Sequence, residues 1–418
     1  MKRILYILAA FAAAAACTIA PQTSESFADK VIFEFNTRQM TPEGTFAAAE
    51  ARLPQLRSEG IDVLWIMPLY PIGVKERKGT LGSYYAIRDY CDVNPEFGTL
   101  EDFDHFLAEA HAQGFKVIID WVANHTSPDH PWVTGKPAEW YVRDEGGNTV
   151  VEYDWTDIAK LNYDCPDVRE EMLKCMSFWL ERGIDGFRCD MAYIVPRDFW
   201  AEAIPALRAA AGRPLYFLAE GEEPWLHEVG FDTSYSWKLH HLMNDIAQGK
   251  AGAADLKEYL AWNGSEYPQS AYRLTFTSNH DENSWSGTEY DRMGDAWKLM
   301  TALCFTLPGS QPLVYTAQPL GYDHSFQFFE KDPIPAEQWT SDDAHACEAF
   351  YKQLCDTYHA HPALWPGQEG ATWEYLDEDS EGEEDWITFK RTLGDDVVRV
   401  SAHLAEPWEY GIFIGEQQ

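Results

Sequence analysis

Four apolar stretches of the chain each end in charged side chains. Runs of this kind, rich in β-branched and aromatic residues, are typical of buried strands. The charged residues at their ends are Asp120, Arg188, Asp190, Glu220, His280 and Asp281. Because buried charges without partners are very costly, we expect these groups to meet in one cleft. Side chains two positions apart point to the same face of a strand, so Arg188 and Asp190 should lie together.

Carboxylates that meet an arginine and histidines suit the cleavage of glycosidic bonds. Breaking an acetal needs a protonated acid to help the leaving oxygen, and a second carboxylate to attack or stabilise the oxocarbenium-like centre. An adjacent arginine favours the ionised form of that second carboxylate. The residue types therefore point to glycoside chemistry.

The elements that must position these residues alternate between strand and helix patterns. We predict eight strands, at 31–39, 61–69, 116–122, 183–190, 214–220, 231–237, 272–281 and 311–316. Amphipathic helical stretches lie between them, for example residues 99–114, which Gly114 closes. Eight such units favour an α/β fold of the (β/α)8 TIM barrel type, in which catalytic groups lie at the C-terminal ends of the strands. No glycine-rich phosphate-binding motif follows a strand, so a nucleotide-binding fold has no support.

Two regions break this alternation and divide the chain. Residues 124–163 are rich in Pro, Gly, Trp and acidic side chains, and we predict that they form a loop subdomain inserted after the third strand. The barrel then comprises residues 29–123 and 164–364. Residues 365–418 show short strand patterns separated by acidic turns, which predicts a small C-terminal all-β domain.

Six short motifs follow one another in a fixed order. They are LGSYYAIRDYCDVNPEFGTLEDF (81–103), DWVANH (120–125), KLNYD (160–164), GFRCDMA (186–192), FLAE (217–220) and TSNHD (277–281). Together they resemble the α-amylase superfamily, glycoside hydrolase family 13: four match its numbered sequence regions, KLNYD resembles its fifth region, and the first resembles the segment after its second strand. The resemblance extends over nearly all of residues 29–335.

The resemblance implies a role for each matching residue. Asp190 would be the nucleophile, Glu220 the general acid/base, and Asp281 the group that binds sugar hydroxyls and stabilises the transition state. The substrate-binding residues would be Tyr85, Asp120, His125, Arg188 and His280: Arg188 would hold Asp190, Tyr85 would stack beneath the sugar, the two histidines would bond it, and Asp120 would organise the site. The family mechanism is a retaining double displacement on α-glucosidic bonds, and its chemistry requires no cofactor.

Some assignments have rivals by residue type. Glu222 and Glu223 follow Glu220; strand alternation would put Glu222 on the same side as Glu220, whereas its place beyond the strand end favours a role at the rim. Tyr84 competes with Tyr85, which the motif position favours. Asn124 matches a calcium-binding residue of the calcium-dependent relatives, so a structural calcium is an expectation, and a hydrogen bond that orders the loop is the alternative.

The N-terminus carries processing information. Residues 1–17 have a basic start, an apolar run too short to span a bilayer comfortably, and small residues before Cys17. The run Ala14–Cys17 resembles a bacterial lipobox that lacks the usual leucine, which predicts lipidation at Cys17; ordinary signal cleavage nearby is the alternative. Residues 18–28 would be a polar tether. We therefore expect an exported protein, lipid-anchored in a bacterial envelope on its periplasmic or outer surface.

The charge of the chain restricts its partners. The formal net charge of −36 argues against binding nucleic acid or anionic lipid head groups, because both are polyanions.

The expected partner is a neutral α-glucan, and the expected activity is hydrolysis of α-1,4-glucosidic bonds in starch or maltooligosaccharides. A glucanotransferase, an α-glucosidase or a neopullulanase-like enzyme would use the same carboxylates. A non-catalytic glucan-binding protein on the same fold is disfavoured because all three carboxylates are present.

Overall fold

The computed structural model describes residues 26–376 and 385–415. The predicted signal segment with Cys17 and most of the predicted tether lie outside the described residues, as do residues 377–384 and 416–418 of the predicted C-terminal domain. The remaining predictions can be compared with the structure.

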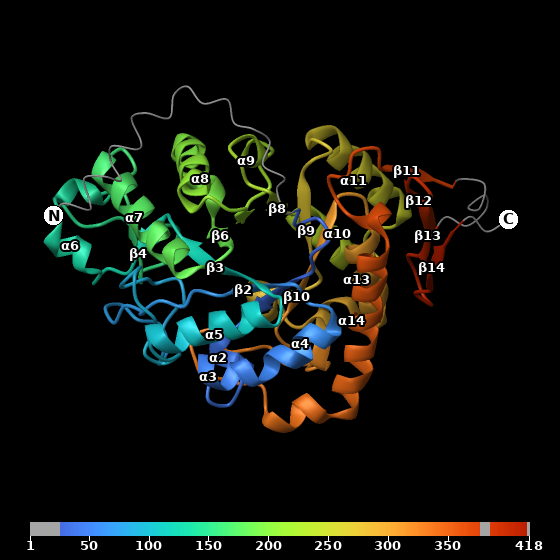
Figure 1. Ribbon diagram of the computed structural model, residues 1–418, viewed down its shortest axis with the longest axis horizontal. Coiled ribbons are helices and arrows are strands. Elements are labelled where there is room, and N and C mark those ends of the chain that lie inside the picture. Colours follow the sequence, from blue (N-terminus) through green and yellow to red (C-terminus); the bar gives the residue numbers. More distant parts are fainter. Residues whose placement is uncertain (1–25, 377–384, 416–418) are drawn as a thin grey trace.

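Eight parallel strands close into a barrel at the centre of the molecule (Figure 1). Around the barrel the strand order is β1-β10-β9-β8-β7-β6-β3-β2. The strands are β1 (Ile32–Phe35), β2 (Val63–Ile66), β3 (Lys116–Val122), β6 (Gly186–Asp190), β7 (Tyr216–Ala219), β8 (Thr233–Tyr235), β9 (Tyr272–Thr275) and β10 (Ser310–Tyr315). Seven of these strands lie inside the predicted ranges, and β10 begins and ends one residue before its predicted range. The TIM barrel prediction is therefore confirmed.

Helices surround the barrel and fill the connections between its strands. They are α2 (Thr37–Met40), α3 (Phe46–Ala49), α4 (Leu53–Glu59), α5 (Leu100–Ala112), α6 (Pro131–Gly135), α7 (Pro166–Arg182), α8 (Arg197–Ala211), α9 (Trp225–Glu228), α10 (Trp237–Ala247), α11 (Ala253–Glu266), α12 (Glu289–Met293), α13 (Trp297–Thr306) and α14 (Asp342–Ala360). Short 3₁₀ segments occur at Glu50–Arg52, Ala138–Trp140, Ala192–Ile194, Gly294–Ala296, Gln318–Leu320, Ala336–Thr340 and Pro362–Leu364, and a π-helical turn at Glu282–Ser286.

Helix α5 shows how local residues of the sequence determine where a helix begins, which face it buries and where it ends. Thr99 accepts a hydrogen bond from the backbone of Asp102, whose side chain in turn accepts from the backbone of Thr99, and this capping box starts the helix. The predicted apolar positions Phe103, Phe106, Leu107 and Ala110 are all buried. Gly114, at φ +85°, ends it.

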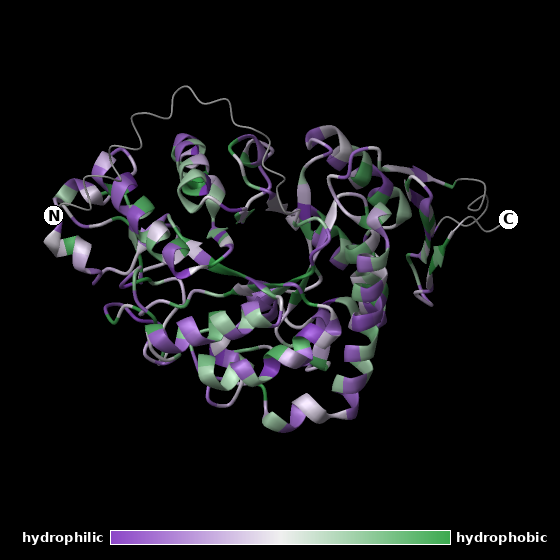
Figure 2. Ribbon diagram, viewed as in Figure 1, coloured by the Kyte–Doolittle hydropathy of each residue, from purple (hydrophilic) through white to green (hydrophobic). Residues whose placement is uncertain are grey.

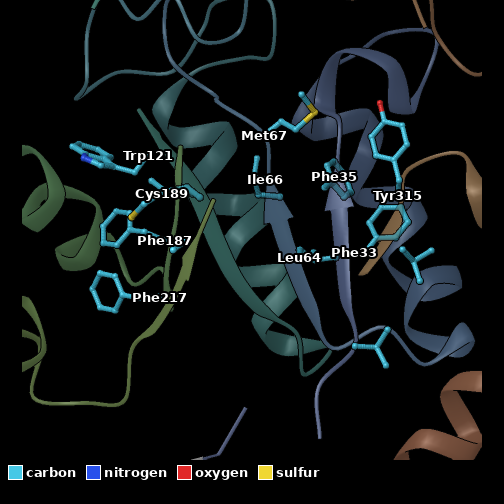
Figure 3. Close-up of a cluster of buried hydrophobic side chains, with 14 of the residues drawn as sticks. Phe33, Phe35, Leu64, Ile66, Met67, Trp121, Phe187, Cys189, Phe217 and Tyr315 are labelled. Carbon is cyan, nitrogen blue, oxygen red and sulfur yellow. The ribbon is translucent and has the colours of Figure 1, made fainter. Parts of the chain in front are cut away.

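Side chains on the barrel strands alternate between two hydrophobic clusters. On β1, Ile32 belongs to the cluster inside the barrel, whereas Phe33 and Phe35 belong to the cluster between the barrel and its helices. Figure 3 shows part of this outer cluster, with Phe187 and Cys189 from β6 and Phe217 from β7 side by side. Residues between these positions therefore face the barrel interior. This set includes Arg188 and Asp190, which the sequence predicted to share a face.

Two further sheets lie outside the barrel. The segment between β3 and α7 contains a small antiparallel pair, β4 (His125–Thr126) with β5 (Ala159–Lys160), in addition to α6. The C-terminal sheet has the order β11-β12-β13-β14 and is antiparallel throughout. Its strands are β11 (Thr372–Tyr375), β12 (Trp386–Leu393), β13 (Asp396–His403) and β14 (Tyr410–Ile414). Figure 1 shows this sheet beside α11 and α13, away from the barrel mouth.

Polarity follows the same layering. Figure 2 shows mostly green, hydrophobic strands in the barrel and helices that carry both green and purple residues around it. In residues 26–376 and 385–415, no helix combines the length and the apolar character that a membrane span needs.

Candidate active site

A single buried guanidinium joins the carboxylates at the strand ends. Arg188, on β6, lies 3.0 Å from Asp120 Oδ1, 3.2 Å from Asp190 Oδ1 and 2.9 Å from Glu220 Oε2. These three carboxylates come from β3, β6 and the residue after β7, which are neighbouring strands of the barrel. The structure thus brings together four of the residues that the sequence singled out.

The ring of Trp65 and the hydroxyl of Tyr235 support Arg188 from inside the barrel. The guanidinium carbon lies 4.9 Å from the centre of the Trp65 ring, and Arg188 Nε donates to the Tyr235 hydroxyl at 3.3 Å. The indole Nε1 of Trp65 donates to Asp120 at 3.1 Å. A planar fork held by a ring contact and a hydrogen bond in this way has little freedom to turn away from the carboxylates.

Asp190 presents one unpartnered oxygen to the cavity. Its Oδ1 bonds Arg188, whereas its Oδ2 is buried and has no hydrogen-bond partner among the described residues. Burial and the nearby charge of Glu220 raise the pKa of Asp190 well above its ordinary value, and Arg188 opposes this shift. The arginine alone therefore does not set the charge of Asp190, which differs from the simpler expectation from sequence.

The residue after Asp190 has an unusual backbone conformation. Met191 has φ +42°, in the left-handed region that costs an L-residue about 1–2 kcal/mol. In this conformation its N–H donates to Glu220 Oε2 at 2.8 Å. The turn therefore holds the Glu220 carboxyl beside the end of β6, next to Asp190.

A hydrogen-bonded chain connects Asp120 to the opposite side of the barrel. The hydroxyl of Tyr85 donates to Asp120 Oδ2 at 3.2 Å and lies 2.8 Å from Nε2 of His280. Nδ1 of His280 bonds the fully buried carboxylate of Glu34, on β1. The charges of Asp281 and Glu34 raise the pKa of His280 to about 9 against the effect of burial, so the ring is a cation at neutral pH.

A cavity of about 560 Å³ lies at the barrel mouth, and Tyr85, Asp190, Glu220 and His280 are part of its lining. Its lining residues are Lys78, Ser83, Tyr85, His125, Asp154, Trp155, Asp157, Ile158, Asp190, Met191, Glu220, His280, Asp281, Trp285, Phe328 and Phe329. Nε2 of His125 is buried there without a hydrogen-bond partner among the described residues, and burial lowers the pKa of His125 to about 4. The side chain of Asp281 is 40% exposed, and its Oδ2 lies 3.4 Å from His280 Nε2. The cavity therefore offers open polar atoms to a ligand.

The structure separates the rivals that the sequence left open. Tyr84 is buried and its hydroxyl donates to Asn36, whereas Tyr85 lines the cavity and stacks on His280 with ring centres 5.3 Å apart. Glu222 lies outside the cavity and pairs with Arg273 at 3.1 Å. This position agrees with the role at the rim that the place of Glu222 beyond the strand end favoured, and not with strand alternation, because Gly221, at φ +155°, turns the chain between the two glutamates.

Several site residues were not found from the sequence. Glu34, Trp65 and Tyr235 contact the predicted residues from inside the barrel. Glu34 carried a signal, since it is a carboxylate within the apolar stretch VIFEF. The aromatic side chains Trp285, in the π-helical turn, and Phe328 and Phe329, in the loop after β10, lie outside the barrel strands, where residue type alone gave no position.

The surroundings of Asn124 do not fit a calcium ion. Its amide nitrogen lies 3.2 Å from His125 Nδ1 and 3.5 Å from Glu152 Oε2. The ammonium of Lys160 lies 2.6 Å from the same Glu152 oxygen. Calcium needs six to eight oxygen ligands, but here the available carboxylate is already neutralised by an amine. No cluster of three or more metal-ligating side chains occurs in the described parts of the chain.

Comparisons with known proteins agree with this geometry. The family model described as alpha amylase, catalytic domain, matches residues 24–139 and 134–401. The chain is 28% identical over 349 residues to alpha-amylase MalA of Haloarcula japonica, covering 80% of this chain and 49% of that protein. It is 32% identical over 221 residues to alpha-1,4-glucan:maltose-1-phosphate maltosyltransferase 2 of Streptomyces coelicolor, covering 47% and 33%. The chain thus spans between a third and a half of the length of these two relatives.

The solved structures extend the similarity to the whole fold. An α-amylase from Lactobacillus plantarum superposes with a TM-score of 0.80 at 27% identity, covering 90% of this chain and 88% of that chain. The barrel, the strand-end carboxylates and the family model together show that the chain belongs to the α-amylase family, glycoside hydrolase family 13.

Proposed function

We propose that the protein hydrolyses α-1,4-glucosidic bonds in starch or maltooligosaccharides with retention of configuration. The observation that carries the proposal is the convergence of Asp190 and Glu220 on Arg188 at the edge of a cavity that Asp281 also lines. A double displacement needs two neighbouring carboxyls, and Asp281 lies on the same cavity, where it can contact the same sugar.

In the first step, Oδ2 of Asp190 attacks the anomeric carbon. The glycosidic C–O bond breaks as Glu220 gives its proton to the leaving oxygen, and an Asp190–sugar ester forms. In the second step Glu220 removes a proton from water, the water oxygen bonds the same carbon, and the ester bond breaks. Asp190 and Glu220 return to their starting protonation states, and the sugar keeps its configuration.

Other residues act on the sugar ring. Tyr85 offers an aromatic face beside the nucleophile, where a sugar can stack. His125 presents a free ring nitrogen for a sugar hydroxyl. The positive charge of His280 holds Asp281 near the ring, and Asp281 can accept hydrogen bonds from two adjacent hydroxyls. These hydrogen bonds strengthen as positive charge develops on the ring.

A glucanotransferase, an α-glucosidase or a neopullulanase-like reaction is the alternative on the same site. The transferase differs in what accepts the glycosyl group in the second step, and the two hydrolases differ in what the subsites admit. The decisive experiment is a time course of the purified protein with soluble starch, maltooligosaccharides and pullulan, with products separated by length. Release of new reducing ends supports hydrolysis, whereas products longer than the substrate would replace it with transfer. Asp190→Asn should abolish both reactions, and undiminished activity of this variant would overturn the site.

We also propose that the protein is exported and anchored through a lipid on Cys17. The support is the order of basic, apolar and small residues before Cys17. Fractionation of cells that express the full chain tests the anchor. The wild type should stay with the membranes and the Cys17→Ser variant should not, and equal release of both would contradict the proposal.

A further inference from the structure

The loop after β2 contacts two other loops at the cavity wall. The loop after β2 reaches the loop after β10 through a hydrogen bond from Leu81 N–H to the carbonyl of Phe329, 3.0 Å long. It reaches the inserted segment through the ion pair between Lys78 Nζ and Asp157 Oδ1, 3.2 Å long. Lys78 and Asp157 both line the cavity, so their pair forms part of its wall.

The backbone around Lys78 is fixed. Gly79 has φ +59°, and a Cβ there would lie 2.5 Å from Cβ of Phe329, so only glycine allows this close approach. The next residue donates its N–H to Glu330 at 2.9 Å. On the other side, Arg77 Nε donates to the carbonyl of Gly73 at 2.8 Å. Lys78 is thus held in place against Asp157.

The position of Glu220 gives the cavity a direction. The group that protonates the leaving oxygen must lie on the side of the departing sugar. Glu220 follows β7, which lies across the barrel from β2 and β10, the strands whose loops carry Tyr85 and Phe328. The part of the substrate that stays bound to Asp190, the glycone, must extend the other way, past Tyr85. Phe328 stacks on Tyr85 with ring centres 6.4 Å apart and is followed by Phe329, which contacts the loop of Lys78. Lys78 and Asp157 therefore lie on the glycone side.

We propose that the Lys78–Asp157 ion pair closes the glycone end of the cavity and makes the enzyme exo-acting, so that it removes short units from the non-reducing end of an α-glucan. This inference rests on the proposed function and adds the position of the cleaved bond. A long glucan can pass this end only if the pair opens. Because the Asp157 side chain is only 5% exposed, opening would leave a nearly buried carboxylate without its cation.

The test compares two maltoheptaosides that carry a chromogenic aryl group at the reducing end. One has a free non-reducing end, and in the other a 4,6-acetal blocks that end. The wild type should cleave the free substrate and leave the blocked one almost untouched. Lys78→Ala should raise the rate on the blocked substrate relative to the free one by at least about tenfold, the effect of removing one specific obstacle in a subsite. Lys78→Arg should keep the wild-type ratio, because it keeps the cation.

Lys75→Ala is the matched control, since Lys75 is an exposed lysine of the same loop that does not line the cavity, and it should keep the wild-type ratio. If Lys78→Ala is unstable, Asp157→Asn serves as the second variant and should raise the ratio as well. Equal cleavage of both substrates by the wild type, or an unchanged ratio in both variants, would overturn the closed end. Failure of the wild type on the free substrate would instead contradict the proposed function.

Discussion

Arg188 and Arg273 are both buried arginines on barrel strands, but they lie on opposite faces of the barrel wall. Arg188 faces the interior and bonds three carboxylates at the edge of the cavity. Arg273 faces outward, where its guanidinium lies 3.7 Å from the centre of the Tyr267 ring and bonds one carboxylate, Glu222. The difference shows that burial and an acidic partner do not mark a catalytic arginine. What distinguishes Arg188 is the face of the strand on which it lies and the number of carboxylates that meet it there.

The same contrast separates Glu220 from Glu222. These residues lie two positions apart and have the same chemistry, yet one bonds Arg188 inside the barrel and the other bonds Arg273 outside it. Glu222 also accepts hydrogen bonds from the backbone N–H of Lys238, at the start of α10. Its role is to tie the loop after β7 to a helix, a structural role that predicts effects on stability.

The largest expected effect is a loss of kcat that only one of these two glutamates should show. Glu220→Gln should lower kcat on maltooligosaccharides by about 10²–10⁴-fold, the range for loss of a general acid. Glu222→Gln should leave kcat close to the wild-type value. Steady-state kinetics on maltoheptaose measures both. A large loss of kcat in a folded Glu222→Gln variant would instead make Glu222 the general acid and Glu220 the structural residue.

The next largest effect is on kcat as well, and it should separate substitution of Arg188 from substitution of Arg273. Lysine cannot reproduce the planar fork that holds several carboxylates, so Arg188→Lys should lower kcat by about 10²-fold through misplacement of Asp190 and Glu220. Arg273→Lys should retain activity and instead lower the free energy of unfolding by about 1–3 kcal/mol. Denaturant unfolding and kinetics of both variants test this division, and loss of activity in a stable Arg273→Lys would contradict it.

The third prediction concerns pH. Asp190 must be ionised to attack while Glu220 is protonated, and burial, the largest cause, raises the pKa of Asp190 above the ordinary value. Activity should therefore be lost as the pH falls through this raised pKa, so the acid limb of kcat/KM should lie well above the aspartate reference of about 3.9. Glu220→Gln, assayed on a glycoside whose leaving group needs no acid, should keep this acid limb, because glutamine carries the same charge as protonated Glu220, and should remove the alkaline limb. Glu222→Gln should keep both limbs.

The smallest effect concerns a third cation, Lys160, which neutralises Glu152 near Asn124. Because the pair is partly exposed, Lys160→Met should lower the free energy of unfolding by only about 0.2–1 kcal/mol. If the amine takes the place that calcium has in some relatives, EDTA should not change the Tm of the wild type. A marked drop in Tm with EDTA, reversed by calcium, would show a metal site that the donor set near Asn124 does not explain.

Much of the fold was predictable because its signals are local. The eight strands are short apolar runs, and helix α5 carries its own cap and apolar stripe. Strand alternation alone predicts that Arg188 and Asp190 share a face, whereas the closed barrel makes this face the inward one. Alternation stopped being a guide where the strand ended, and there the place of Glu222 beyond the strand end was the better guide to its position outside the cavity. Contacts such as Glu34 with His280, 246 positions apart, depend on barrel closure, which no local pattern encodes.

The sequence by itself determined the residue types, the strand ends that carry them and the family they resemble. Only the tertiary structure decided which of two neighbouring acids meets Arg188, which oxygen of Asp190 is open, and which lysine meets Asp157 at the cavity wall. The physical reason is that charge, burial and free hydrogen-bonding capacity are properties of a place in the fold, where segments far apart in the sequence set one another's surroundings.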